Sequence, residues 1–215
     1  MIKERLVFFR EFLTDFQSTG SCFPSSVWAA RELIEPLMDK TREPKRILEV
    51  GPGSGPVTVE ILKNMQDGDT LALCEINPRL MKTLKEKLEK NCDFQKRRDS
   101  VTFHQCAIQD FPEGQQFDLI VCAIPFLNLD RPTVEEIFKK LSNLCAPGGI
   151  LTYFEYIGIR VVSKMVSPPE RKRRIRELDS FFRKIYSQNL IERKHVWLNV
   201  LPINVYKLKL QNAQV

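Results

Sequence analysis

Residues 46–55 of this chain read RILEVGPGSG, and this stretch decides the fold. The apolar run at residues 47–50 has the pattern of a buried parallel strand, with the acid Glu49 near its end. Three glycines then alternate with other residues, which predicts a tight turn whose backbone can approach a ligand closely. Pro56 suits the first position of a helix, because the N–H that proline lacks is not needed there. We therefore expect a strand, a turn and a helix start that bind a small polar or anionic group with backbone donors.

Strand-like and helix-like patterns alternate along the rest of the chain. Predicted strands follow at residues 70–75, 101–106, 117–123 and 150–156, with predicted helices between them at residues 57–65, 78–91 and 130–145. This alternation predicts a parallel sheet with helices on both faces. After a predicted basic helix at residues 168–186, a short link joins two strand-like runs at residues 191–200 and 204–210. Such a link predicts an antiparallel hairpin.

The first part of the chain precedes this alternation and is predicted to be helical. Apolar residues at spacings of three and four within residues 2–16 predict an amphipathic helix. A serine can cap a second helix over residues 26–40, which Pro36 is expected to kink. We therefore divide the chain into an N-terminal helical extension at residues 1–45 and a ligand-binding domain at residues 46–215.

The composition narrows the class of protein and of partner. The chain has 215 residues, of which 43% are hydrophobic, and this suffices for one domain with a full core. No apolar run reaches the roughly 18 residues that a membrane span needs, and the N-terminus has no secretory pattern, so we expect a cytoplasmic protein. A formal net charge of +6 favours an anionic partner, either nucleic acid or an anionic membrane surface. The six cysteines form no CxxC pair, so we expect no metal site.

Residues at the ends of the predicted strands form one candidate site. In an open parallel sheet, a ligand binds outside the carboxyl ends of the strands. Residues 49–55, Glu75, Cys106 and residues 122–125 all fall at such ends. We therefore expect them to lie together in space, although they are far apart in the chain.

Two common phosphate-binding loops do not fit this turn. The dinucleotide fingerprint G-x-G-x-x-G requires a glycine where this chain has Pro56. A terminal antiparallel hairpin is also unusual for a dinucleotide-binding domain. The phosphate-clamping P-loop requires G-K-[ST], a sequence that the chain lacks.

The sequence EVGPGSG at residues 49–55 resembles the first motif of the class I S-adenosylmethionine-dependent methyltransferases. Other motifs occur in the same order as in that family: Glu75 ends the second strand, Phe-Asp at residues 117–118 opens the fourth, and Pro-Gly-Gly at residues 147–149 precedes the fifth. The resemblance implies an enzyme with S-adenosyl-L-methionine as its cofactor. It also implies a Rossmann-like, seven-stranded, mostly parallel α/β sheet with one antiparallel strand. The cofactor-binding residues that it implies are Glu49, Gly51, Pro52, Gly53, Gly55, Glu75, Ile76, Cys106, Ala107 and Cys122.

Two of these positions carry specific expectations. Members of the family hydrogen-bond the ribose hydroxyls with an acid at the position of Glu75, and a carboxylate can accept two such bonds. They commonly carry another acid after the third strand, on the adenine amino group, where this chain has Cys106. Asp110, four residues later, is either a substitute for that acid or a loop carboxylate. We expect adenine recognition to rest on backbone groups and on Ala107.

The methyl acceptor is expected beside the ends of the fourth and fifth strands. Methyl transfer from a sulfonium needs no acid and no metal, so the main contribution of the protein is alignment and exclusion of water. Ile124 and Pro125 follow the fourth strand and Tyr156 ends the fifth, so we name these three as catalytic residues on the acceptor side. Aromatic faces suit an acceptor that carries an ammonium group. No residue is a clear general base, which leaves water or a phosphate of the acceptor to take the proton.

Two methyltransferase families share this layout. The rRNA adenine N6-dimethyltransferases have N-[IL]-P-[YF] after the fourth strand, whereas residues 123–126 read AIPF. The missing asparagine counts against a nucleic-acid base, because its amine would be buried without a partner. Bacterial phospholipid N-methyltransferases of the phosphatidylethanolamine type are similar over nearly the whole chain, including residues 9–26, 124–128 and 196–206. This resemblance implies methylation of the phosphatidylethanolamine head group. The alternatives are an RNA adenine N6-methyltransferase and a non-catalytic cofactor-binding module.

Two segments suit a membrane partner. Residues 2–16 set phenylalanine and leucine against a partly basic face, which suits the interface of a bilayer. Residues 170–184 carry seven basic side chains, each worth on the order of 1 kcal/mol near an anionic surface. RNA phosphates would suit this second segment equally well. We expect a cytoplasmic enzyme that binds the inner face of the membrane peripherally.

Overall fold

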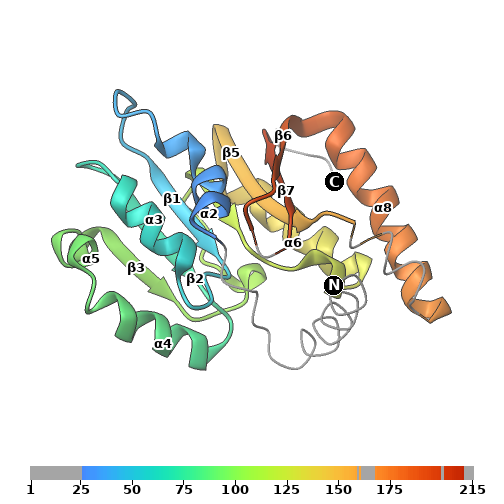
Figure 1. Cartoon of the computed structure of the whole chain (residues 1–215), viewed down its shortest axis with the longest axis horizontal. Helices are drawn as coiled ribbons and strands as arrows, with labels where there is room; N and C mark the ends of the chain where they lie inside the picture. The colour runs from blue at the N-terminus through green and yellow to red at the C-terminus, as the bar shows by residue number, and fades with distance from the viewer. Residues whose placement is uncertain (1–25, 159, 161–167, 200, 211–215) are drawn as a thin grey trace.

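The computed structural model describes residues 26–158, 160, 168–199 and 201–210, which form one sheet with helices on both faces (Figure 1). The strands are β1 Arg46–Val50, β2 Thr70–Cys74, β3 Val101–His104, β4 Phe117–Cys122, β5 Cys145–Tyr156, β6 Leu190–Val196 and β7 Ile203–Leu208. The α-helices are α2 Val27–Leu33, α3 Pro56–Asn64, α4 Pro78–Leu88, α5 Cys92–Lys96, α6 Arg131–Leu144 and α8 Pro169–Asn189. Short 3-10 helices are η1 Glu35–Leu37, η2 Arg98–Ser100, η3 Ile108–Asp110 and η4 Phe126–Asn128. The predicted helix at residues 2–16 lies outside the described residues.

The sheet has the strand order β3-β2-β1-β4-β5-β7-β6. Strands β1 to β5 are parallel, and β7 is antiparallel to both of its neighbours. This confirms the predicted seven-stranded sheet with one antiparallel strand. The register aligns Val50 with Cys74 on one side and with Cys122 on the other. The carboxyl ends of three central strands therefore lie level at one edge of the sheet.

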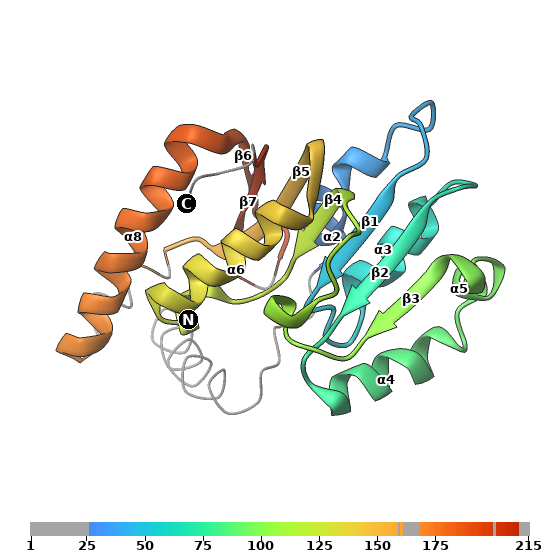
Figure 2. The same cartoon turned by 180° about the vertical axis from the view of Figure 1, so that it is seen from behind.

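Helices cover both faces of the sheet, as Figures 1 and 2 show from opposite sides. Helices α2 to α5 bury side chains in one hydrophobic cluster, and α6 and α8 bury theirs in a second. Alternation along β1 supplies both clusters, since Ile47 belongs to the first and Leu48 to the second. Among the described residues, no helix combines the length and the apolar content needed to cross a bilayer.

The predicted helix over residues 26–40 is shorter than expected. Helix α2 ends at Leu33, and Pro36 lies in the 3-10 helix that follows, because proline cannot donate the hydrogen bond that an α-helix needs there. Helix α2 and η1 bury Ala30, Leu33 and Leu37 in the same cluster as Ile47 of β1. The domain boundary that we placed after residue 45 therefore separates segments that share one core.

Two further boundaries differ from the prediction. The predicted start of the fifth strand at residue 150 is wrong, because β5 already begins at Cys145 and includes the Pro-Gly-Gly sequence at residues 147–149. The register shifts from Phe117–Cys145 to Leu119–Ile150, so the additional residues of β5 form an irregularity within the strand rather than a turn before it. Helix α4 ends at Leu88, three residues early, because Asn91 accepts a hydrogen bond from the Phe94 N–H and caps the separate helix α5.

Candidate functional site

A pocket of about 430 Å³ opens at the carboxyl edge of the sheet. Its wall is built mainly from the ends of β1, β2, β3 and β4 and the segments that follow them. Phe154 of β5, Thr133 and Ile137 of α6, and Leu129 just before α6 complete it. The wall contains Glu49, Val50, Gly51, Pro52, Gly53, Ser54, Pro56, Val57, Cys74, Glu75, Ile76, Asn77, Leu80, Cys106, Ala107, Ile108, Gln109, Ala123, Ile124, Pro125, Leu129, Thr133, Ile137 and Phe154. The topology thus brings together most of the strand-end residues that the sequence predicts to form one site.

The glycine-rich turn presents open backbone to this pocket. Gly51 has a φ of 72°, and its N–H donates to the Cys74 carbonyl at 2.8 Å, which ties the turn to β2. Gly53 has a φ of 57°, and a Cβ at this position would meet no atom within 4 Å. Its N–H donates to Glu75 Oε2 at 3.1 Å. A ligand can therefore come within contact distance of the backbone at Gly53, where any side chain would stand in its way.

Gly55 has a different role from the other two glycines. It precedes α3 in the left-handed conformation, with a φ of 81°, and it is absent from the pocket wall. A Cβ at Gly55 would lie 2.4 Å from Cδ1 of Leu84, a fully buried residue of α4. Close packing between α3 and α4 therefore requires this glycine.

Glu49 places a carboxyl group in the pocket wall without exposing it to solvent. The Thr58 hydroxyl donates to its Oε2 at 2.7 Å, whereas its Oε1 is buried and has no hydrogen-bond partner. Burial, together with the nearby charge of Glu75, raises the pKa of Glu49 to about 8. The carboxyl group is therefore mostly neutral at pH 7, and it suits a ligand that brings a cation to the unpartnered oxygen.

Glu75 is held in position by the backbone on either side of it. One carboxyl oxygen accepts from the Gly53 N–H and the other accepts from the Asn77 N–H at 2.9 Å. Each carboxylate oxygen has a second lone pair, so two ligand hydroxyls can still be bound. Beside it, Ile76 is 68% exposed and presents an apolar surface to the pocket.

The adjoining part of the wall follows β3 and contains Cys106, Ala107 and Gln109. Sγ of Cys106 lies 3.9 Å from Sγ of Cys74, and burial raises the pKa of the Cys74 thiol, which keeps it neutral. Asp110 is not part of this wall. The polar side chain that the structure places there is that of Gln109, which sequence reasoning missed.

The structure does not place Cys122 or Tyr156 in the pocket wall. Cys122 is fully buried, because its side chain faces the cluster covered by α6 and α8. Tyr156 packs in the other cluster, edge-on to Phe154 with ring centroids 5.7 Å apart. Phe154 supplies the aromatic face of the wall, while Ile124 and Pro125 lie in the wall as expected.

Further residues of the wall were missed because they do not follow a strand directly. Asn77 caps α4, and Leu129 and Thr133 flank Asp130, which caps α6 by accepting from the Thr133 N–H. Their signal in the sequence was the capping pattern itself, which marks where a helix begins next to a strand end. Among the described residues, no group of histidine, cysteine, aspartate and glutamate side chains is arranged to hold a metal ion.

The chain resembles known methyltransferases in sequence. Residues 47–149 match the family model described as a methyltransferase domain. An ornithine lipid N-methyltransferase of Singulisphaera acidiphila is 22% identical over 149 residues, which are 69% of this chain and 76% of that protein. A malonyl-[acyl-carrier protein] O-methyltransferase of Halalkalibacterium halodurans is 25% identical over 128 residues, which are 58% of this chain and 45% of that protein.

Solved structures share the fold at low sequence identity. The glycopeptide N-methyltransferase MtfA, complexed with S-adenosyl-L-methionine, has a TM-score of 0.62 and 13% identity, covering 85% of this chain and 94% of that one. The N-methyltransferase NodS of Bradyrhizobium japonicum, in complex with S-adenosyl-L-homocysteine, has a TM-score of 0.57 and 17% identity, covering 83% of this chain and 85% of that one. The domain match, the seven-stranded fold and the glycine-rich pocket together identify the chain as a class I S-adenosylmethionine-dependent methyltransferase.

Proposed function

We propose that this enzyme methylates the primary amine of a membrane aminolipid, of which phosphatidylethanolamine is our first candidate. The observation that carries the proposal is the composition of the acceptor side of the pocket. There the wall is mostly apolar, with Ile124, Pro125, Leu129, Ile137 and the aromatic Phe154, and Thr133 is its polar residue. A nucleic-acid base would find no side-chain amide in these residues to pair with its amine. The relative named as an ornithine lipid N-methyltransferase supports an aminolipid as the class of acceptor.

The residues of the wall suit S-adenosyl-L-methionine bound in one orientation, with its amino group at Glu49 and its ribose at Glu75. We assign the unpartnered Oε1 of Glu49 to the amino group of the cofactor, since that group is the cation which this buried oxygen lacks. Glu75 would accept from the ribose hydroxyls. Ile76 and Ala107 would flank the adenine ring from two walls of the pocket. Open backbone at Gly53 lets the cofactor pass close to the turn.

The chemistry of the step divides between the cofactor and the chain. The cofactor supplies an electrophilic methyl group on a sulfonium. Ile124 and Pro125 would align the acceptor amine with that methyl group and exclude water from it. The face of Phe154 would stabilise the positive charge that the amine gains. The amine attacks in its neutral form. The wall contains no histidine or lysine, and we assign both of its carboxyl groups to the cofactor, so the proton of the amine passes to water or to the lipid phosphate.

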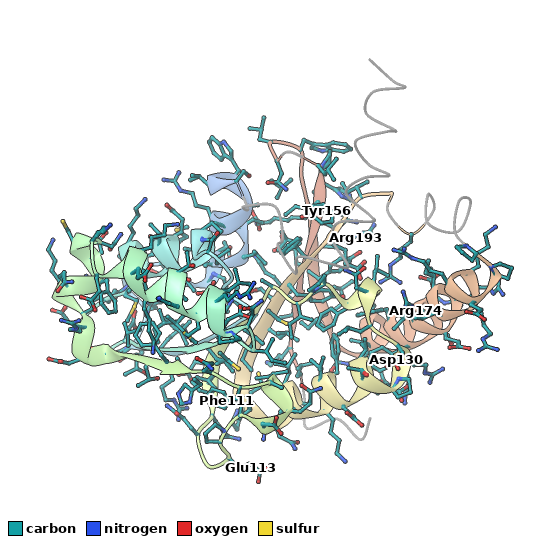
Figure 3. All side chains as sticks on the ribbon, turned by 90° about the horizontal axis from the view of Figure 1, so that it is seen from below. Phe111, Glu113, Asp130, Tyr156, Arg174 and Arg193 are labelled. Atoms are coloured by element: carbon teal, nitrogen blue, oxygen red, sulfur yellow. The ribbon has the colours of Figure 1, made fainter. Side chains whose placement is uncertain are left out.

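Two arginines on α8 suit the anionic group of such a lipid. Arg171 and Arg174 lie three residues apart on one side of the helix, and the Nε atom of each is buried without a hydrogen-bond partner. Burial and the adjacent charge of Arg174 lower the pKa of Arg171. Figure 3 shows Arg174 beside Asp130, whose neighbours Leu129 and Thr133 line the pocket. A phosphate or carboxylate near the reacting amine would neutralise this pair of cations.

Transfer of a labelled methyl group tests the proposal directly. The purified chain is incubated with methyl-labelled S-adenosyl-L-methionine and, in separate reactions, phosphatidylethanolamine vesicles, ornithine lipid vesicles or rRNA. Label in phosphatidylethanolamine supports our first candidate, and label in ornithine lipid alone changes the head group while keeping the class. Label in rRNA but in neither lipid would overturn the proposal.

We also propose that the enzyme binds an anionic membrane surface through residues 2–16 and the basic residues at 170–184. Deleting residues 1–16 should abolish binding to vesicles that contain phosphatidylglycerol, because the apolar part of the attachment is lost. Binding of S-adenosyl-L-homocysteine serves as the control for folding and should be unchanged. Vesicle binding that survives the deletion would remove the first segment from this proposal.

A further inference from the structure

An exposed apolar surface joins α2 to the connection between β6 and β7. It consists of Val27, Trp28, Trp197 and Leu198, which we call the tryptophan patch. Trp28 is 57% exposed, Trp197 is 67% exposed and Leu198 is 66% exposed. Large side chains with this degree of exposure contribute little to the core, so their presence together on one surface calls for a partner.

Contacts between the two segments make the patch continuous. The Ser26 N–H, directly before Val27, donates to Asn199 Oδ1 at 2.9 Å, directly after Leu198. Further along, Nζ of Lys194 lies 3.0 Å from a carboxylate oxygen of Glu32, which joins β6 to α2 again. Residues far apart in the chain are thus held side by side by polar contacts, while their apolar side chains remain outside.

The patch lies at the same edge of the sheet as the pocket. Ile203 of β7 pairs with Tyr156, the last residue of β5, and also with Val196, the last residue of β6. Strand β6 therefore ends level with β5, and Trp197 and Leu198 project beyond that end. Because the cofactor pocket opens at the carboxyl ends of β1 to β4, pocket and patch lie at the same edge of the sheet.

The same edge also carries positive charge. Helix α8 ends at Asn189, next to the start of β6 at the opposite edge, so its N-terminal half extends toward the pocket edge. That half carries the basic residues Arg171, Lys172, Arg173, Arg174 and Arg176. An anionic lipid surface complements both features, because it takes basic side chains at its head groups and tryptophan at its interface.

We propose that the tryptophan patch inserts into the interface of an anionic phospholipid bilayer and turns the pocket mouth toward the lipid head groups. This inference rests on the proposed function in that it assumes a lipid acceptor. It adds an anchoring surface distinct from residues 2–16 and 170–184. Tryptophan suits such a place, since its ring is apolar and its N–H can bond to the head groups.

The intrinsic fluorescence of the wild-type protein tests this directly, because Trp28 and Trp197 are the two tryptophans in the whole sequence. Vesicles of phosphatidylcholine and phosphatidylglycerol, which contain no phosphatidylethanolamine, should shift the emission to shorter wavelength. Brominated phosphatidylcholine should quench it. Emission that is unchanged while the protein sediments with vesicles would overturn the proposal. So would emission already at short wavelength without vesicles, which would indicate that another segment or a second copy covers the patch.

Variants then connect the patch to turnover. Trp28→Ser/Trp197→Ser should bind these vesicles about tenfold more weakly or worse, because two large apolar contacts are lost. It should methylate phosphatidylethanolamine in vesicles correspondingly more slowly, yet keep the wild-type rate on short-chain phosphatidylethanolamine below its critical micelle concentration. Ile191→Ser is the matched control, since Ile191 is 53% exposed at the other end of β6.

The outcomes separate this inference from the proposed function. Wild-type protein that binds vesicles through the patch but methylates neither form of phosphatidylethanolamine contradicts the acceptor and leaves the docking surface intact. A double variant that methylates vesicles at the wild-type rate contradicts the patch and leaves the acceptor intact. A double variant that loses both substrates equally contradicts the patch as well, because its effect is then on folding or chemistry.

Discussion

Replacing Glu49 by glutamine should stabilise the ligand-free protein and weaken cofactor binding, and both effects should depend on pH. The pKa of Glu49 is raised from its ordinary 4.5 to about 8, so the folded protein retains a proton that the unfolded chain releases. The stability associated with that proton is fully present below about pH 4.5 and is lost as pH rises through 8. At about 1.4 kcal/mol per pH unit, the full loss is on the order of 5 kcal/mol.

Urea unfolding of the ligand-free wild type and of Glu49→Gln, at several values from about pH 5 to about pH 9, measures this difference. Glutamine does not titrate, so the free energy of unfolding of the wild type should fall relative to the variant as pH increases. Glu86→Gln, at an exposed position of α4, controls for general effects of removing a carboxylate. A difference between wild type and Glu49→Gln that stays constant over this range would refute the reasoning.

The same substitution that stabilises the ligand-free protein should weaken its binding of the cofactor. Titration calorimetry with S-adenosyl-L-homocysteine should show weaker binding to Glu49→Gln by about tenfold or more, because an ammonium group loses its buried carboxylate partner. For the wild type near pH 7, Glu49 must give up its proton to form that pair. Heats measured in two buffers of different ionisation enthalpy should therefore reveal proton release, which the variant should lack.

Four substitutions separate roles that the sequence does not distinguish. Gly55→Ala should lower the free energy of unfolding by about 2–5 kcal/mol in urea melts, since a positive φ adds to a collision with Leu84; an unchanged midpoint would contradict that contact. Gly53→Ala should cost only about 1–2 kcal/mol of stability but reduce affinity for S-adenosyl-L-homocysteine in calorimetry, and equal losses at both glycines would remove the distinction. Phe154→Leu should lower kcat for the lipid, whereas Tyr156→Phe should not; the reverse order in a steady-state assay would restore Tyr156 to the acceptor side.

Much of the fold follows from local patterns along the chain. Glycine, proline and asparagine act through their own backbone or side chain, so the turn at residues 51–55 and the caps of several helices follow from the sequence. The alternation of strands and helices then leaves few topologies, and the order β3-β2-β1-β4-β5-β7-β6 is among them. The boundaries that failed lie at Leu33, Leu88 and Cys145, where the end of a helix or the pairing of a strand depends on neighbouring segments.

The candidate site is predictable to a lesser degree. A position near the end of a strand could be read from the sequence, but the direction of its side chain could not. Cys122 and Tyr156 stand at strand ends and point into the two clusters, whereas Phe154, two residues before an end, faces the pocket. Phe154 and Tyr156 are two residues apart and therefore point to the same face of β5, so alternation along the strand does not separate them. Which of the two side chains reaches the pocket depends on the distant segments that pack around each of them.

Residues 49–55 determined by themselves the kind of turn and the start of a helix, because those properties are carried by neighbouring residues. Together with Glu75, their resemblance to methyltransferase motifs also indicated the cofactor. Only the tertiary structure decided which of these residues line the pocket. It separated Gly53, which faces open space, from Gly55, which packs against Leu84. It also placed Trp28 beside the strand end at Trp197, at the edge where the pocket opens. Such proximity arises from the register of strands distant in the chain, which no local pattern encodes.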